Sequence, residues 1–227
     1  MNRCNHFLIG VILVIICVHF DALAQDSIKT KPENPHGLMV IHKTNPFAIL
    51  WGPIPLTAEY RYVREMVIAG NQSLLVGVSY LGKSPVFTMF ENQGGNNNSQ
   101  NTPKIRVSGL RFQMGMRWYT GNIYAPKGFY VGPLVSYSTA KFTTDYYNTY
   151  NIYIKATHFN INMLMGVQGV VSNRFTVDLF CGLGYKKNSW EEHYSATKIR
   201  NINLKDAPFF YNGPVKFTLG LNVGLGF

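Results

Sequence analysis

Residues 214–227 read PVKFTLGLNVGLGF, and this C-terminal stretch decides the fold. From Val215 to Phe227 every second side chain is apolar, and the positions between them are polar or glycine. A period of two places all of the apolar side chains on one face of an extended strand. A tilted strand of about 9–11 residues crosses a bilayer. The stretch therefore predicts a membrane-spanning strand, with one face toward lipid and the other toward a polar lumen.

Seven further segments show the same alternation, at residues 47–51, 56–62, 74–80, 110–118, 129–137, 159–167 and 175–185. Beyond residue 24 no run of 18 consecutive apolar residues occurs, so spanning helices are not expected. Strands satisfy their backbone polar groups in lipid only when they form a closed barrel. The sequence predicts an all-β fold, an eight-stranded antiparallel up-and-down transmembrane β-barrel.

The connections between the predicted strands alternate in length. Those at 65–72, 122–127 and 172–174 are short, and those at 83–103, 143–155 and 187–213 are long. An even number of strands places both chain ends in the periplasm, so the short connections become periplasmic turns and the long ones outer loops. The first outer connection, 52–55, is unusually tight and follows the weakest strand. Pro133 cannot donate to a strand ladder, so a bulge is expected there.

The first 24 residues have the features of a cleaved secretion signal. Arg3 supplies a positive charge, residues 7–20 form a short apolar run, and Ala22 and Ala24 give the small-x-small pattern that precedes cleavage. The mature chain is then expected to begin at Gln25. The predicted organisation is a signal peptide at 1–24, a short periplasmic N-terminal tail at 25–41 and an outer-membrane barrel at 42–227.

The composition fits a membrane barrel better than a soluble domain. Charged residues make up 14% of the chain and aromatic residues another 14%, whereas soluble proteins carry about one quarter charged residues.

Loss of the leader leaves Cys181 as the one cysteine, so an internal disulfide is not expected. The net charge of +10 suits anionic lipopolysaccharide as a partner. The basic residues are scattered, which argues against nucleic acid, and no phosphate, dinucleotide or metal motif predicts a cofactor.

Five charged side chains fall on the polar face of the predicted strands: Glu59, Arg61, Arg111, Arg117 and Asp178. The lumen of an eight-stranded barrel is only just wide enough for side chains. Charges there must meet opposite charges, because unpaired buried charge is costly. We therefore expect a plug of ion pairs that closes the barrel. The alternative is a narrow gated pore that prefers small anionic solutes.

Three other interpretations remain open. The alternation also fits a soluble lipocalin-like barrel, but the leader and the aromatic strand ends at Trp118, Tyr137 and Tyr185 favour lipid on the outside. A lipid-modifying enzyme needs a serine, a histidine and an acid together. His158, Ser136, Ser138 and Asp178 lie in no motif of that kind, so no enzymatic activity is predicted. The tyrosine-rich segment 143–153 suits contact with an extracellular ligand at the outer loops.

Several stretches carry a family resemblance: HKTNPFAILW (42–51), LTAEYRY (56–62), residues 117–119, GFYVGP (128–133) and FTVDLFCGLGY (175–185). With these motifs the chain resembles the small outer-membrane β-barrel proteins of the Bacteroidota. More distantly, it is similar to the eight-stranded OmpA and OmpX barrels. The resemblance implies a location in the cell outer membrane and a barrel fold, and it brings no catalytic residue.

The C-terminal residues resemble the insertion signal of bacterial outer-membrane proteins. The resemblance implies that the barrel-assembly machinery reads Phe217, Leu219, Leu221, Val223, Leu225 and Phe227. Taken together, the sequence predicts an integral outer-membrane barrel with a charge-plugged lumen and a structural or surface-contact role.

Overall fold

The computed structural model describes residues 40–54, 56–93, 105–120, 125–144, 152–172, 174–195, 197–202 and 213–227. All of them belong to the compact unit Pro35–Phe227. The predicted signal peptide, its cleavage site at Ala22, Ala24 and Gln25, and residues 25–39 of the predicted tail lie outside this part of the chain. Within the described ranges, no helix is long and apolar enough to cross a membrane.

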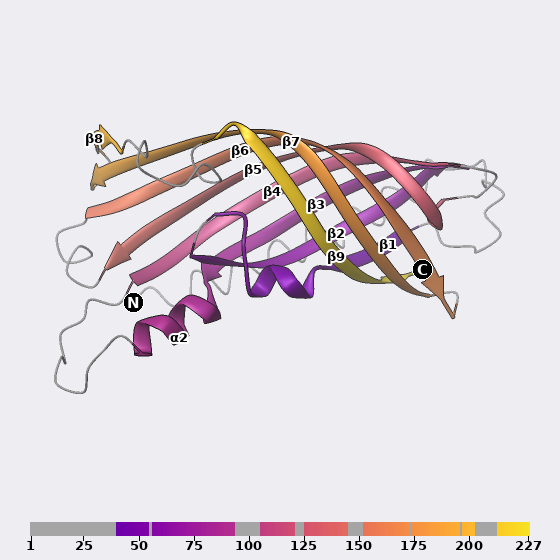
Figure 1. The fold of residues 1–227 in the computed structure, drawn as a ribbon, viewed down its shortest axis with the longest axis horizontal. Coiled ribbons are helices and arrows are strands. Elements are labelled where there is room, and N and C mark those ends of the chain that lie inside the picture. The colour runs from indigo at the N-terminus through magenta and orange to yellow at the C-terminus, as the bar shows by residue number, and fades with distance from the viewer. Residues whose placement is uncertain are drawn as a thin grey trace. The chain divides into compact units, whose positions relative to one another are not determined.

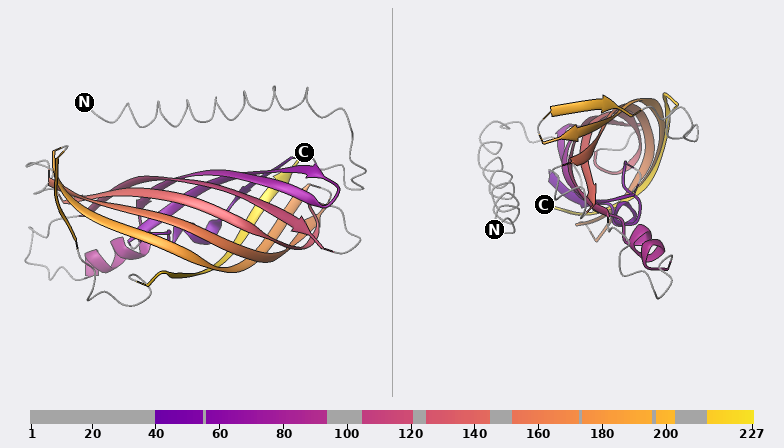
Figure 2. Two further views of the ribbon diagram at one scale, coloured as in Figure 1. Left: turned by 90° about the horizontal axis from the view of Figure 1, so that it is seen from above. Right: turned by 90° about the vertical axis from the view of Figure 1, so that its left-hand side faces the viewer.

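Eight strands form a closed barrel in which every neighbouring pair is antiparallel. The wall consists of β1 (Val40–Thr44), β2 (Thr57–Ala69), β3 (Gln72–Lys83), β4 (Ile105–Tyr119), β5 (Gly128–Thr144), β6 (Ile152–Val171), β7 (Phe175–Tyr194) and β9 (Val215–Gly226). Consecutive wall strands pair with each other, and β1 closes the ring by pairing with β9 (Figure 1 and the right view of Figure 2). The predicted all-β up-and-down barrel is therefore confirmed.

Two elements lie outside the wall, in connections that were predicted to be outer loops. The helix α2 (Pro85–Gln93) follows β3, and the short strand β8 (Thr197–Asn201) pairs with the far end of β7 only. Figure 2 shows α2 projecting away from the barrel in the view along its axis. Helix α2 is tied to the wall by an ion pair between Lys83 and Glu91 and by the hydrogen bond that the Ile105 amide donates to Glu91 (3.2 Å).

The first strand differs from the prediction. Residues 47–49, which were expected to begin a strand at 47–51, lie instead in the 3₁₀ helix η1 (Pro46–Ile49). Pro46 has no N–H to lose at a helix start, and the Asn45 side chain accepts a hydrogen bond from the Ala48 amide (3.0 Å), which caps the turn. The first strand is instead Val40–Thr44, so the connection to β2 is longer than the expected 52–55.

Other boundaries also differ. The strand β2 continues to Ala69, so the predicted turn at 65–72 shrinks to Gly70 and Asn71. The strand β7 continues to Tyr194, well into the predicted outer loop at 187–213. The bulge expected at Pro133 is absent from β5, because its pairing with β4 keeps one register on both sides of the proline and its pairing with β6 runs straight through it.

The barrel interior alternates between apolar and polar layers. One apolar cluster consists of Val67, Tyr119, Ala125, Tyr130, Leu134, Leu164 and Phe180, and a second consists of Ile54, Leu81, Val107, Ala140, Phe142 and Ala156. Along β5, the buried Ser136 and Ser138 separate the two clusters. Phe180 is an apolar side chain on the inward, otherwise polar face of β7. Gly220 on β9 has no side chain and leaves space for the Phe180 ring.

Candidate functional site in the barrel lumen

The first polar layer is the Asp178 cluster, which we define as Lys43, Glu65, Arg117, Asp178 and the neutral side chains bonded to them. Asp178 on β7 accepts hydrogen bonds from Arg117 Nη2 (2.7 Å), Tyr130 Oη (2.6 Å) and Asn222 Nδ2 (2.9 Å). The Lys43 ammonium lies 3.4 Å from the same carboxylate. Asp178 thus joins β7 to four other strands.

Glu65 on β2 completes the Asp178 cluster. Its carboxylate forms an ion pair with Lys43, lies 3.4 Å from Arg117 Nη1 and accepts hydrogen bonds from Ser73 Oγ (2.5 Å) and Tyr119 Oη (2.7 Å). Two cations therefore face two carboxylates, and all four side chains are nearly or fully buried. A buried group of charges with balanced signs and satisfied hydrogen bonds avoids the cost of isolated charge.

The second polar layer is the Glu59 cluster, which consists of Glu59, Arg61, Arg111 and their hydrogen-bond partners. Arg61 donates two hydrogen bonds to the Glu59 carboxylate, from Nε (2.8 Å) and Nη2 (2.7 Å). Arg111 Nη1 donates another (2.8 Å), and Ser79 Oγ donates a fourth (2.7 Å). One carboxylate thus serves two guanidinium groups, which leaves this layer with excess positive charge.

The structure places the predicted charges in these two layers and adds two that the sequence did not reveal. Glu59, Arg61 and Arg111 meet in one layer, and Arg117 and Asp178 meet in the other. Lys43 and Glu65 were missed because the predicted first strand began after Lys43 and Glu65 was assigned to a turn. Val63, Glu65 and Val67 lie in phase with the inward-facing Glu59 and Arg61 of β2. This spacing could have revealed Glu65 as a lumenal residue.

The side chains considered for catalysis do not form a serine–histidine pair in the described part of the chain. His158 is buried, makes a hydrogen bond with the Pro53 backbone and lies edge-on to Trp190, with ring centroids 6.2 Å apart. The Ser136 hydroxyl accepts hydrogen bonds from Arg111 Nη2 (3.2 Å) and Asn160 Nδ2 (3.3 Å) rather than pairing with His158. Asp178 lies in the other polar layer, where it is bonded to Arg117.

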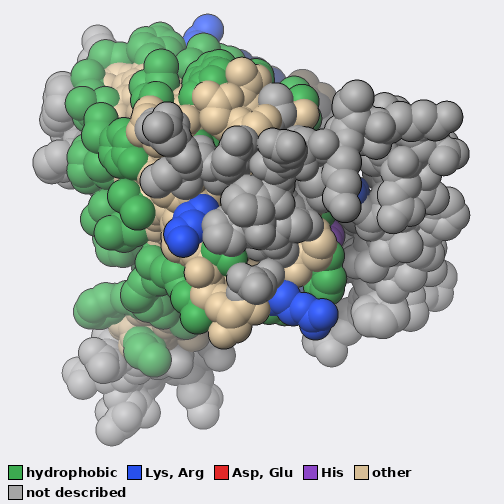
Figure 3. Space-filling view, turned by 90° about the vertical axis from the view of Figure 1, so that its right-hand side faces the viewer, with side chains coloured by type: hydrophobic (Ala, Val, Ile, Leu, Met, Phe, Trp, Pro, Cys, Tyr) green, Lys and Arg blue, Asp and Glu red, His purple; other side chains and the backbone are tan. Residues whose placement is uncertain are grey.

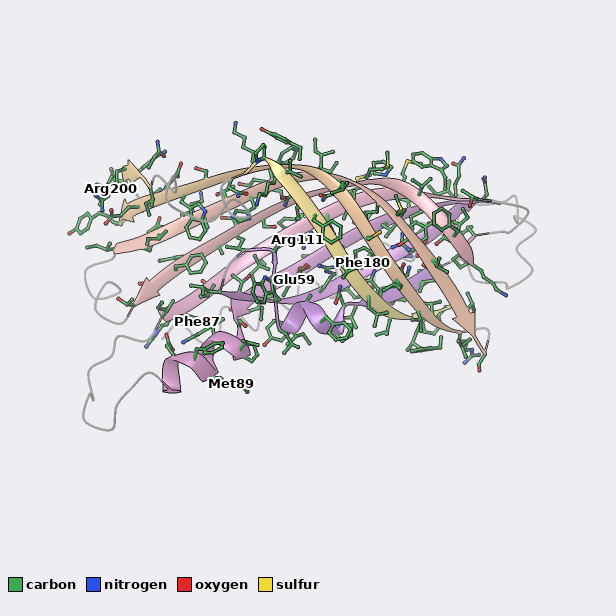
Figure 4. All side chains as sticks on the ribbon, viewed as in Figure 1. Glu59, Phe87, Met89, Arg111, Phe180 and Arg200 are labelled. Carbon is green, nitrogen blue, oxygen red and sulfur yellow. The ribbon has the colours of Figure 1, made fainter. Side chains whose placement is uncertain are left out.

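A cavity of about 460 Å³ lies beside the Glu59 cluster. Apolar side chains of Val63, Leu75, Leu134, Leu164 and Phe180 line part of it, and the charged groups of Glu59, Arg61 and Arg111 line another part. Figure 4 labels Glu59, Arg111 and Phe180, which lie near one another inside the barrel beside β9. A volume of this size is within the range of small-molecule sites, roughly 300–1,000 Å³.

The residues of the predicted C-terminal signal lie on β9 and at its end. Phe217 and Leu219 are 68% and 69% exposed on the outer face, and Leu225 and Phe227 are exposed as well. Leu221 and Val223 are half-buried. The Phe227 ring lies 5.7 Å from the His42 ring, and its backbone pairs with Val40 at the closing seam of the barrel.

No protein-family model matches the chain, and neither a characterised protein nor a solved structure matches it at a significant level. The class of protein therefore follows from the fold alone. It is a closed, all-antiparallel eight-stranded barrel, which is compatible with the barrels of outer membranes.

Proposed function

We propose that this protein is an integral outer-membrane β-barrel whose ion-paired side chains close the lumen and whose role is structural or surface contact. One observation carries the proposal: the barrel is apolar outside and charged inside. The exposed outer side chains include Val76, Tyr80, Phe112, Met114, Val135, Tyr137, Ile161, Met163, Met165, Val167, Leu179, Leu183, Phe217 and Leu219. Figure 3 views the barrel from one end, and hydrophobic side chains lie along the left-hand side of the picture.

This distribution is the reverse of that in a soluble barrel. Soluble monomers rarely expose a contiguous apolar patch larger than a few hundred Å², whereas these side chains alternate along most of the wall strands. The interior holds Lys43, Glu59, Glu65, Arg111, Arg117 and Asp178, all buried. A transmembrane barrel requires this arrangement because its outer face meets hydrocarbon and its lumen is polar.

The Asp178 cluster supports a closed lumen. Its side chains come from β1, β2, β4 and β7 and bond to one another across the interior, and Gln168 of β6 accepts hydrogen bonds from Lys43 and Arg117. An ion would have to break several charge-assisted hydrogen bonds to pass. We expect such a barrel not to conduct.

The surface-contact role is supported by helix α2 at the outer end of the barrel. Its side chains Met89 and Phe90 are exposed, although Glu91 anchors the helix to the wall. These two neighbouring apolar side chains offer a partner a small hydrophobic surface on an anchored helix. Other residues assigned to outer loops, including 145–151 of the tyrosine-rich segment, lie outside the described residues.

A small gated pore is the second candidate, and the excess positive charge of the Glu59 cluster favours it. Ion conductance distinguishes the two functions, measured in a planar bilayer that contains the refolded chain from Gln25 to Phe227. Insertion is first established by a heat-dependent shift in gel mobility, with a sixteen-stranded porin as the positive control for conductance. We expect an inserted barrel that stays silent. Discrete anion-selective steps would overturn the closed lumen and support the pore.

A further inference from the structure

Strand β1 closes the ring, but the hydrogen-bonded wall is interrupted along part of this side because β1 is short. It has 5 residues, whereas β2 has 13 and β9 has 12. Strand β1 pairs with residues 63–66 of β2 and with residues 223–226 of β9. Among the described residues, no strand therefore lies between 57–62 of β2 and 215–222 of β9. We call this region the wall seam.

The chain crosses the wall seam in irregular form. After β1 it forms η1, which contacts both β2 and β9, and then continues through Trp51 and Pro53. The Gly52 amide donates to the Thr57 carbonyl (2.7 Å), so this segment covers part of the β2 edge. Trp51 is 73% exposed, which places an indole ring at the surface of the seam.

The lumenal cavity opens through the wall seam. Its lining includes the Glu59 cluster inside the barrel and also Val215, Phe217 and Leu219, whose side chains are exposed on the outer face of β9. Trp51 and Pro53 border the same cavity. Because one cavity touches both sets of residues, it extends from the Glu59 cluster to β9 at the wall seam.

The charges that line the cavity favour an anion. They are the cations Arg61, Arg111, Arg117, Lys186 and Lys216, with Glu59 as the one carboxylate among the lining residues. Arg117 is balanced by Asp178 and Glu65 in the Asp178 cluster, so the excess positive charge lies at the Glu59 cluster and Lys216.

Several buried polar atoms at the cavity lack partners in the described part of the chain, and they include Gln113 Oε1, Thr218 Oγ1 and Asn222 Oδ1. Two others are Nε of Arg111 and Nε2 of His158, whose side chains are both more than nine-tenths buried. Buried polar groups are normally hydrogen-bonded, because an unsatisfied group costs free energy. Both residues line the cavity. A negatively charged oxygen atom placed there could accept from the guanidinium group.

Apolar side chains form another part of the lining, beside neutral polar ones such as Gln113 and Asn160. Phe180, Leu134 and Leu164 lie on the lumen side, and the β9 side chains continue this apolar surface out through the seam. A ligand that fits both parts has an anionic headgroup and a hydrocarbon chain. A small inorganic anion would leave the apolar part of the cavity without a partner.

The position of the wall seam also indicates that this ligand comes from the lipid of the membrane. A 12-residue strand tilted by about 45° spans roughly 28 Å along the membrane normal, at ~3.3 Å per residue. In the proposed orientation Phe227 lies at the periplasmic side, so residues 215–220 lie in the outer half of the membrane. An open strand edge at this depth is tolerated only where it lines a polar cavity or is covered.

We propose that the cavity behind the wall seam binds an anionic amphiphile that enters sideways from the outer leaflet. The phosphate or carboxylate headgroup is held by Arg61, Arg111 and Lys216, and the hydrocarbon chain lies along Phe180 and leaves between η1 and β9. This inference rests on the proposed membrane location, because a seam that faced water would receive no lipid.

The test uses Trp51 as a reporter in the chain from Gln25 to Phe227, with Trp118→Phe and Trp190→Phe so that a single indole remains. The barrel is refolded in dodecyl maltoside, and folding is checked by heat-dependent gel mobility. The probe is an undecyl phosphate brominated at its chain end, which quenches an indole on contact. We expect saturable quenching that dodecyl phosphate reverses and that inorganic phosphate does not.

Two substitutions and one control locate the headgroup site. Lys216→Gln and Arg111→Gln should each weaken probe binding about tenfold or more, because each removes a charge from the site. Lys187→Gln makes the same change on an exposed, outward-facing side chain of β7 and should leave binding unchanged. Lys216→Gln remains informative if Arg111→Gln fails to fold, since the Glu59 ion pairs do not include Lys216.

Each other outcome would contradict the inference. Quenching that rises linearly with probe, or that Lys216→Gln leaves unchanged, would mean that the seam holds no headgroup site. Equal competition by inorganic phosphate would assign the cavity to small anions that enter from the aqueous end. A chain that folds in detergent but binds no probe would overturn this inference alone, whereas a chain that never inserts into lipid would overturn the proposed function as well.

Discussion

Replacing Asp178 by asparagine should destabilise the barrel strongly. The carboxylate balances one of two buried cations, Lys43 and Arg117, and Glu65 balances the other. In Asp178→Asn one positive charge is left unmatched in the lumen, and the new amide group turns a donor toward the donors of Arg117 and Tyr130. Breaking a buried ion pair in this way costs about 3–5 kcal/mol.

A second substitution distinguishes charge balance from loss of packing. Lys43→Met alone leaves Glu65 and Asp178 facing only Arg117, and it should also destabilise the barrel. The double variant, Lys43→Met with Asp178→Asn, restores the balance and leaves the pair Arg117–Glu65 in place. We expect it to cost about 1–3 kcal/mol less than the sum of the single variants, as for residues in one ion-pair network.

The measurement is the free energy of unfolding in urea, with the barrel in lipid vesicles and the folded fraction read from unheated gels. Glu192→Gln serves as the control because it breaks the ion pair to Arg200, whose side chain is 72% exposed. Its cost should stay below about 1 kcal/mol. Additive costs within ~0.5 kcal/mol for the two lumen substitutions, or a cost for Asp178→Asn no larger than that of the control, would refute a charge-balanced plug.

Three further predictions test the wall. Met114→Arg, at a position 58% exposed on the outer face of β4, should cost about 2–4 kcal/mol in lipid vesicles, whereas a water-facing site would tolerate it within ~0.5 kcal/mol. Gly132→Ala should abolish refolding on gels, because its Cβ would clash with the Met116 carbonyl of β4. Gly169→Ala, whose nearest neighbouring atom is 3.9 Å away, should refold normally. Deleting Phe227 removes the backbone pairing with Val40 and should lower the fraction of heat-shiftable protein in isolated outer membranes, and an unchanged fraction would argue against a C-terminal insertion signal.

The strands that alternate in sequence are those with an apolar outer face and a largely polar face toward the lumen. This is why β3 to β6 and β9 could be predicted from a period of two. The period fails where a strand leaves that environment. The end of β7 reads KKNSWEEHY and still pairs with β6 in continuous register, but the sequence there has no apolar face. Hydrogen bonding continues after the pattern stops, so the sequence could not give the length of the strand.

The lumen was only partly predictable for a related reason. The position of a charge on the polar face is visible in sequence, whereas its partner depends on the tilt and register of strands far apart in the chain. Glu59 and Arg61 are neighbours on one strand, but Asp178 meets Lys43 across 135 positions. No local pattern relates Lys43 to Asp178.

The one strand placed wrongly is also the one that shapes the cavity. Phe47, Ile49 and Trp51 alternate as a strand would, but Asn45 and Pro46 give a stronger local signal, since an asparagine cap followed by proline starts a helix. Proline has no N–H to donate to β9, so a strand through this point would leave a gap in the ladder. The chain instead leaves the sheet after Thr44 and turns into η1. A full-length first strand would have sealed β2 to β9 and separated Phe217 and Leu219 from the Glu59 cluster. The opening in the wall therefore follows from two residues at the end of a five-residue strand.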